Sequence, residues 1–138
     1  DLQAPFTALM AIANGESKIT ETIFENRMNH VDVLNKMGAN IKLDKNVAFI
    51  KGVKTIKGMD LVASDLRSSA ALIIAGITAK GSSRIYGLEH LDRGYENFES
   101  KLKALGIKIT REFNKKTLTN KEFKTSSDPA DIPRYKAA

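Results

Sequence analysis

The feature of this chain that most constrains its fold is an internal repeat with a spacing of about 66 residues. Four landmarks recur in the same order: Asp1-Leu2 as Asp65-Leu66 (64 residues on), Gly15 as Gly81 (66), Arg27 as Arg93 (66) and Gly38 as Gly106 (68). A period of this length is typical of a duplicated supersecondary unit, because solenoid arrays repeat every ~20–50 residues. We therefore predict two related units, residues 1–60 and 61–113.

The hydrophobic pattern assigns helices and strands within each unit. Apolar residues at helical spacing predict helices over 5–13, 25–38, 66–80 and 95–106. Short apolar or alternating runs predict strands over 17–24, 40–43, 47–52, 61–63, 82–87 and 107–113. This order favours an α/β or α+β fold with helices on one side of a sheet and the two equivalent aspartates at one edge. The residues expected to face inward from 25–38 and 95–106 are Val31, Leu34, Met37, Phe98, Leu102 and Leu105.

The two ends of the chain differ from this pattern. The second unit follows a strand at 61–63, whereas no strand precedes Asp1, so we expect the chain to be part of a longer protein. Residues 114–138 have isolated apolar residues without a period, two prolines and a Ser-Ser-Asp-Pro turn signal. We expect this irregular tail to be mobile or to dock as a strand-like extension, and its deletion to leave the body folded.

Composition and charge exclude several classes of function. The tail holds six basic and three acidic residues, which leaves 16 basic and 13 acidic residues in the body, so the net charge of +6 does not indicate a nucleic-acid partner. The chain has no run of about 18 apolar residues, which a membrane-spanning helix would need, so no membrane span is predicted. The chain has no cysteine, which agrees with a reducing cytoplasm and excludes thiolate ligands. No spacing of His, Asp and Glu indicates a metal site, and GVKTIKG lacks the pattern of a phosphate-binding loop, so no metal or cofactor is expected.

Charged residues stand where a strand meets the apolar helix 66–80. Asp65 precedes this helix, and its simplest role is an N-cap that accepts backbone N–H groups, which contributes about 0.5–2 kcal/mol. Arg67 lies in the first helical turn, where a cation opposes the helix macrodipole. Its presence there indicates that the helix N-terminus and the guanidinium are both directed at an anion.

The repeat places two more arginines at equivalent junctions. Arg27 and Arg93 both follow a strand, so the fold is expected to bring them and Arg67 to one edge, where three guanidinium groups can bind a dianion or trianion through forked contacts. One arginine of this kind is most often a solvated surface residue. Three at equivalent positions favour an anion site.

Candidate acid and base groups accompany these arginines. Asp1 and Asp65 are equivalent in the repeat, and a carboxylate near several arginines stays ionised and can accept a proton from a hydroxyl group. The alternatives are His30 and His90. We expect His30 to be a partly exposed packing residue of an amphipathic helix and His90 to be structural.

Three segments together resemble a known family. They are DLQAPFTALMAIANGESKITETIFENRMNHVDVLNKMGANIKL, ASDLRSSAALIIAG and LDRGYENFESKLKALGIKI. They are similar to the C-terminal portion of the UDP-N-acetylglucosamine enolpyruvyl transferases, also called UDP-N-acetylglucosamine 1-carboxyvinyltransferases. The resemblance covers residues 1–113, and the tail is expected to have no counterpart in the family. It implies part of an inside-out α/β barrel that closes on its substrates against a separate N-terminal domain.

The resemblance also implies an activity and its residues. The family transfers enolpyruvate from phosphoenolpyruvate to the 3'-hydroxyl of UDP-N-acetylglucosamine in the cytoplasm, the first committed step of peptidoglycan synthesis. The chain alone is expected to be inactive, since the N-terminal domain supplies a lysine and the loop cysteine that fosfomycin attacks. Carried over by position, the site comprises Asp1 (proton acceptor), Ile23 and Phe24 (sugar-nucleotide contacts), Arg27 and Arg67 (phosphoenolpyruvate carboxylate), Arg93 (phosphate and domain closure), Asp65 (a second catalytic aspartate) and Leu66 beside it.

Two other interpretations remain open at the level of sequence. An enzyme that makes 5-enolpyruvylshikimate 3-phosphate would share the fold and the use of arginines, although FENR followed by MNHV resembles the sugar-nucleotide enzyme more. A non-catalytic α/β module could instead bind an anion or RNA. RNA-binding sheets of this kind carry exposed aromatic residues in a Gly-aromatic pattern, which VAFIKG matches poorly.

Overall fold

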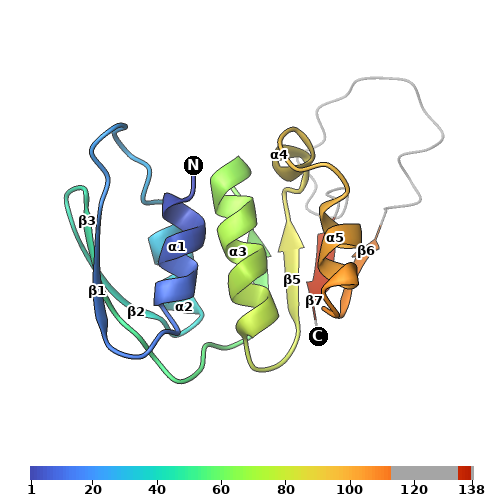
Figure 1. Ribbon diagram of the computed structural model, residues 1–138, viewed down its shortest axis with the longest axis horizontal. Coiled ribbons are helices and arrows are strands. Elements are labelled where there is room, and N and C mark those ends of the chain that lie inside the picture. The colour runs from blue at the N-terminus through green and yellow to red at the C-terminus, as the bar shows by residue number, and fades with distance from the viewer. Residues whose placement is uncertain (113–133, 138) are drawn as a thin grey trace.

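The computed structural model, which describes residues 1–112 and the backbone of 134–137, has a three-stranded and a four-stranded β-sheet with helices packed against them (Figure 1). The elements in chain order are α1 (Gln3–Met10), β1 (Glu16–Thr20), α2 (His30–Lys36), β2 (Asn40–Asp44), β3 (Val47–Lys51), β4 (Asp60–Val62), α3 (Leu66–Thr78), β5 (Ser83–Tyr86), α4 (Glu89–Asp92), α5 (Phe98–Ala104), β6 (Ile109–Glu112) and β7 (Arg134–Ala137). The mixed α/β fold class predicted from the sequence is confirmed.

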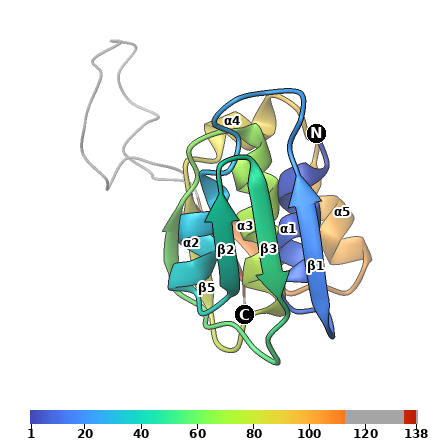
Figure 2. The same cartoon turned by 90° about the vertical axis from the view of Figure 1, so that its left-hand side faces the viewer.

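The two sheets follow the two halves of the chain. Strands β1, β3 and β2 form an antiparallel sheet in that order, and Figure 2 shows this sheet as an outer layer with helices behind it. The second sheet has the order β4-β5-β7-β6. In it β4 is parallel to β5, and β7 is antiparallel to both of its neighbours.

The expectation of one sheet with all helices on one side is wrong. Helix α3 packs against β5 on one side and against α1 and α2 on the other, and α1 and α2 in turn cover the inner face of the three-stranded sheet (Figure 1). The reason lies in the composition of α3, of whose 13 residues eight are buried. A helix that is apolar nearly all round needs cover on more than one side. Small buried residues such as Ser69, Ala71 and Gly76 let its neighbours approach closely.

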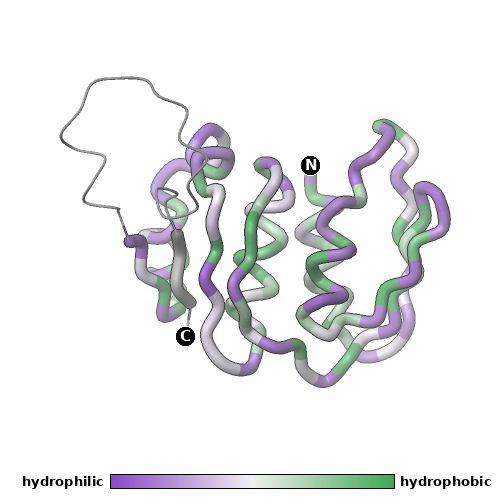
Figure 3. The backbone as a smooth tube through the Cα atoms, turned by 180° about the vertical axis from the view of Figure 1, so that it is seen from behind, coloured by the Kyte–Doolittle hydropathy of each residue, from purple (hydrophilic) through white to green (hydrophobic). Residues whose placement is uncertain are grey.

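The core follows the hydrophobic stretches of α3 and of the strands beside it (Figure 3). The three residues predicted to face inward from α2 are each at most 1% exposed: Val31, Leu34 and Met37. Phe98 and Leu102 of α5 are partly buried against the core, as predicted. The inward position predicted for Leu105 is wrong, because α5 ends at Ala104 and the side chain of Leu105 is 77% exposed.

Equivalent glycines follow the last helix of each unit. Gly38 follows α2 with φ of +102°, and Gly106 follows α5 with φ of +84°. Glycine adopts this left-handed conformation without a steric penalty, which is why it commonly terminates helices. These two glycines of the repeat therefore have the same structural role in both units.

Part of the tail contributes a strand to the second sheet. Residues 134–137 form β7 between β5 and β6, which agrees with the second of the two alternatives for the tail, a strand docked on the body. This strand makes the expectation that residues 114–138 are irregular too broad. Residues 114–133 lie outside the described part of the chain.

Candidate functional site

Helices α1 and α3 begin side by side at one end of the molecule. Figure 1 shows the start of the chain, the start of α3, α4 and the loop 21–29 all at this end. The small buried residues of α3 allow α1 to pack along it, so the first residues of the two helices come together. Helix N-termini carry unpaired N–H groups and partial positive charge, so this end favours anions.

Asp1 and Arg67 form an ion pair across the repeat. The Nε and Nη2 atoms of Arg67 donate to Oδ1 of Asp1 at 3.0 and 2.7 Å. The Asp1 side chain is 81% exposed and that of Arg67 34%, so the pair contributes at most about 1 kcal/mol to stability. A guanidinium has five N–H donors, and Nη1 of Arg67 makes no hydrogen bond within residues 1–112. Arg67 therefore keeps one edge for a ligand.

Asp65 is the N-cap of α3, which confirms the simplest role predicted for it. Its Oδ1 accepts the backbone N–H groups of Arg67 and Ser68, both at 2.9 Å, and its Oδ2 accepts the Ser64 hydroxyl at 2.9 Å. Partial burial raises the pKa of this carboxyl, but the Ser68 N–H, the Ser64 hydroxyl and Arg67 together outweigh that effect and lower the pKa below its usual value. Asp65 is therefore a carboxylate at neutral pH.

The loop 21–29 carries three of the predicted site residues and replaces the start of the helix expected over 25–38. Glu21 turns the chain after β1, because its carboxylate accepts the N–H groups of Ile23 at 2.8 Å and Phe24 at 3.3 Å. The Ile23 N–H bond is the main reason that the pKa of Glu21 is lowered. Ile23 and Phe24 are 77% and 51% exposed, and the Arg27 guanidinium stacks on the Phe24 ring at 3.4 Å. The loop thus presents two apolar side chains and a cation.

A cavity of about 180 Å³ lies where this loop meets the start of α3. We call it the helix-end cavity, and its lining residues are Asn26, Arg27, Asn29, His30, Asp65, Arg67 and Ser68. It brings together Arg27, Asp65 and Arg67, three of the predicted site residues, and Asp1 is joined to it through Arg67. Two guanidinium groups and amide donors around one cavity suit an anionic ligand.

His30 also lines this cavity, and the exposure predicted for it from the sequence is wrong. It was expected to be partly exposed, yet it is 2% exposed at the first residue of α2. Its Nε2 atom is buried and has no hydrogen-bond partner. Burial lowers the pKa of His30 to about 4, although the negative charge of Asp65 raises it, so the imidazole is neutral at pH 7. The available signal was its position three residues after Arg27.

Arg93 and Leu66 both lie outside the set of residues that line the helix-end cavity. Arg93 is an exposed residue at the C-terminal end of α4, and Gly94 follows it. A Cβ atom at Gly94 would lie 2.8 Å from Cδ2 of Leu66, so this turn packs directly on the start of α3. Arg111 of β6 holds α4 through a two-pronged ion pair with Asp92. Within residues 1–112, no hydrogen bond joins Arg93 to the other predicted residues.

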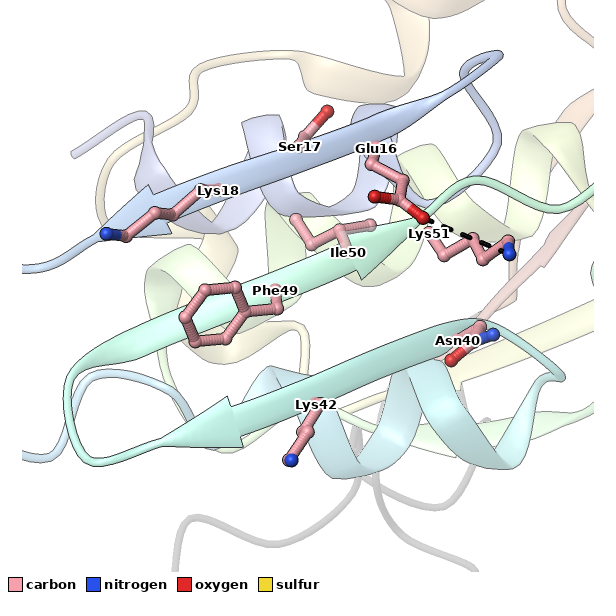
Figure 4. Close-up of a pocket in the computed structure, with 8 residues that line it drawn as sticks. All are labelled: Glu16, Ser17, Lys18, Asn40, Lys42, Phe49, Ile50 and Lys51. Atoms are coloured by element: carbon pink, nitrogen blue, oxygen red, sulfur yellow. Dashed lines mark ion pairs between the residues drawn. The ribbon is translucent and has the colours of Figure 1, made fainter.

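A larger hollow of about 400 Å³ lies elsewhere, on the outer face of the three-stranded sheet (Figure 4). Phe49 stands there opposite Lys18 on one side and Lys42 on the other, with the Lys18 ammonium 5.7 Å from the ring centre. Lys51 and Glu16 form an exposed ion pair at 3.9 Å beside it. This hollow is larger but open, whereas the helix-end cavity has buried polar atoms and converging charges. We therefore place the candidate site at the helix ends.

The part of the chain that the structure describes contains no helix long and apolar enough to cross a membrane. It also contains no group of three or more His, Cys, Asp or Glu side chains arranged to hold a metal ion.

Comparisons with known proteins give these residues a family. Residues 1–102 match the family model described as EPSP synthase (3-phosphoshikimate 1-carboxyvinyltransferase). The chain is 88% identical over all 138 residues to a UDP-N-acetylglucosamine 1-carboxyvinyltransferase of Prochlorococcus marinus (strain MIT 9301), of which it covers 30%. It is 56% identical over 111 residues, 80% of this chain, to the enzyme of the same name from Synechocystis sp. (strain ATCC 27184 / PCC 6803 / Kazusa), of which it covers 25%. Because the Prochlorococcus match includes residues 114–138, the expectation that the tail has no counterpart in the family is wrong.

Solved structures agree with this assignment. The enolpyruvyl transferase NikO from Streptomyces tendae matches 75% of this chain and 24% of its own with a TM-score of 0.68 and 31% identity. EPSP synthase from Acinetobacter baumannii matches 97% of this chain and 28% of its own with a TM-score of 0.64, and at 16% identity this likeness shows the fold alone. The chain spans about 30% of the length of the first curated relatives that it matches. Since the family model covers most of its length, the chain belongs to the EPSP synthase family of carboxyvinyl transferases.

Proposed function

We propose that this chain is the C-terminal part of a cytoplasmic enzyme that transfers enolpyruvate from phosphoenolpyruvate to the 3'-hydroxyl of UDP-N-acetylglucosamine. The observation that supports it most is the meeting of Asp1, Arg27, Asp65 and Arg67 where α1 and α3 begin. Relatives of 88% and 56% identity carry the name of that activity. Residues 1–60 and 61–113 would form two repeat units of the C-terminal domain, and the remaining length of the enzyme would supply the rest of that domain and the N-terminal domain.

In this proposal the residues contact different parts of the two substrates. Arg27 and the unpaired edge of Arg67 bind the carboxylate of phosphoenolpyruvate, Arg93 contacts its phosphate, and Ile23 and Phe24 contact the sugar nucleotide. Asp1 accepts the proton of the sugar hydroxyl while the hydroxyl oxygen bonds to C2 of phosphoenolpyruvate, whose C3 takes up a proton. Loss of phosphate from C2 and of a proton from C3 then restores the double bond. Asp65, with Leu66 beside it, keeps Arg67 in place through the helix cap.

The proposal is tested with a hybrid transferase, in which residues 1–138 are joined to the remaining length of the 88% identical relative. We expect this protein to release phosphate from phosphoenolpyruvate when UDP-N-acetylglucosamine is present and not when shikimate 3-phosphate replaces it. The 138-residue chain alone should release none, because it spans about 30% of its relatives. Phosphate release with shikimate 3-phosphate would assign the chain to the sister enzyme, and release with neither acceptor would refute the proposed function.

A further inference from the structure

His30 is a buried polar residue whose Nε2 atom has no partner in the protein. The residue is 2% exposed, and Nε2 makes no hydrogen bond. Buried side-chain nitrogens are nearly always hydrogen-bonded, because an unpaired one has lost its contacts with water and gained nothing in return. An unpaired nitrogen in a native protein therefore indicates a partner that is absent from the free chain.

The place of His30 indicates what that partner is. His30 is one of the residues that line the helix-end cavity, together with Arg27, Asp65 and Arg67. Asp65 is not its partner within residues 1–112, where Oδ1 of Asp65 accepts from the N–H groups of Arg67 and Ser68 and Oδ2 accepts from the Ser64 hydroxyl. The cavity of about 180 Å³ is large enough for a carboxylate or phosphate group, and its two guanidinium groups favour a negative charge.

The charge state of His30 fits this role. Burial lowers its pKa to about 4, against the opposing effect of Asp65, so that the ring is neutral at pH 7 and carries one N–H group. A neutral imidazole donates one hydrogen bond and adds no positive charge next to the two arginines. It can thus recognise one particular oxygen, while the arginines supply most of the attraction.

We propose that His30 is a further ligand-binding residue of this site, whose Nε2–H group donates a hydrogen bond to an oxygen of the anionic substrate in the helix-end cavity. The proposal rests on the proposed function, since it takes that substrate to be phosphoenolpyruvate. It adds to the arginines a donor on the first residue of α2, so that α2 contributes to the site as well as the start of α3.

The test uses three substitutions at this position in the hybrid transferase. His30→Phe removes the donor and keeps a flat ring, His30→Gln keeps an N–H donor at similar reach, and His30→Asn keeps an N–H donor that is too short. Leu34→Ala is the matched control, because Leu34 is a fully buried residue of the same helix without a polar atom. The measurements are the KM for phosphoenolpyruvate, kcat, and the binding of inorganic phosphate as a probe by calorimetry.

We expect His30→Phe and His30→Asn to raise the KM for phosphoenolpyruvate and to weaken phosphate binding by about tenfold or more, since the lost bond is to a charged group. His30→Gln should remain within about threefold of the wild type, and Leu34→Ala should lower thermal stability without changing KM. If His30→Phe binds both anions as the wild type does, or if His30→Gln loses as much as His30→Phe, the proposal is wrong. A wild-type hybrid without transferase activity would refute the proposed function, whereas phosphate binding would still decide the role of His30.

Discussion

Arg67 Nη2 lies 2.7 Å from Asp1 Oδ1, although 66 positions separate the two residues in the chain. The contact joins the start of the first repeat unit to the start of the second. It also occupies one edge of the guanidinium and leaves the other for a ligand, while the same helix end is capped by Asp65. The pair therefore links the group proposed to accept a proton with the group proposed to bind the substrate carboxylate.

Asp1→Asn should separate these two roles. The amide keeps an oxygen that can accept from Arg67 but cannot take up a proton, so kcat of the hybrid transferase should fall by about 100-fold or more. KM for both substrates should change by no more than about threefold. The free energy of unfolding should change by less than about 1 kcal/mol, because the ion pair is exposed. Lost substrate binding with unchanged turnover at saturation would instead make Asp1 a ligand-positioning group.

Arg67→Lys should mainly affect phosphoenolpyruvate. Lysine has the charge but not the forked geometry, so it cannot bind Asp1 and a carboxylate on two edges at once. We expect kcat/KM for phosphoenolpyruvate to fall by about ten- to hundredfold with the fold intact, and Arg93→Lys to act in the same direction. Arg84→Lys, at an exposed position of β5, is the matched control. Equal kinetics for all three variants would show that Arg67 and Arg93 are surface residues.

Two substitutions at Asp65 should distinguish its cap from its charge. Asparagine caps a helix as well as aspartate does, whereas alanine does not. Asp65→Ala should therefore lower the free energy of unfolding by about 0.5–2 kcal/mol, and Asp65→Asn by much less. Both should reduce activity if the carboxylate is needed for chemistry. Full activity of Asp65→Asn, measured by phosphate release, would restrict Asp65 to the cap that positions Arg67.

The sequence predicted the parts of this structure that depend on local patterns. The N-cap at Asp65 and the inward residues of 25–38 follow from capping chemistry and helical period, and both are present. The proximity of Asp1 and Asp65 followed from the repeat, because equivalent positions in packed units face the same end. The Asp1 to Arg67 contact confirms that the two helix starts meet.

The parts that were missed depend on contacts distant in the chain. Two sheets rather than one arise because α3 is covered on both sides; its apolar composition requires such cover but does not specify which elements supply it. The burial of His30 depends on the start of α3, 35 residues further on, and the local pattern of 25–38 carries no sign of it. Strand β7 was predicted only as one of two alternatives for the tail, because four residues within an aperiodic segment form a strand only when β5 and β6 stand on either side.

Strand β7 leads to a prediction that reverses the expected dispensability of the tail. Lys136 lies between Arg84 of β5 and Thr110 of β6 in the ladder, so its backbone belongs to a central strand. Proline lacks the N–H group and does not fit such a strand. Lys136→Pro should lower the melting temperature of the hybrid by several degrees, whereas Lys136→Ala should leave it nearly unchanged. Equal melting temperatures would mean that β7 adds little to the sheet.

The low pKa of His30 predicts a specific loss of stability in acid. The pKa of His30 is about 4 in the folded protein, against 6.5 for an unperturbed histidine such as that of the unfolded chain. Between these two pH values the unfolded chain therefore binds more protons than the folded one. The free energy of unfolding therefore falls as the pH decreases from 6.5 to about 4, by up to about 1.4 kcal/mol per pH unit from this residue. Asp65 and Glu21, whose pKa values are lowered, lose their contributions in the same direction but at lower pH.

His30→Phe and His30→Gln should both remove this dependence, since neither side chain titrates. Urea unfolding of the hybrid transferase at several pH values between 6.5 and 4.5 measures how the free energy of unfolding depends on pH. This dependence should be weaker in both variants than in the wild type. Because the same two variants are expected to differ in anion binding, the buried charge state and the hydrogen bond to the ligand can be tested separately. Equal slopes for the wild type and both variants would show that His30 is protonated in the folded protein as readily as in the unfolded one, and hence is not the buried neutral donor described above.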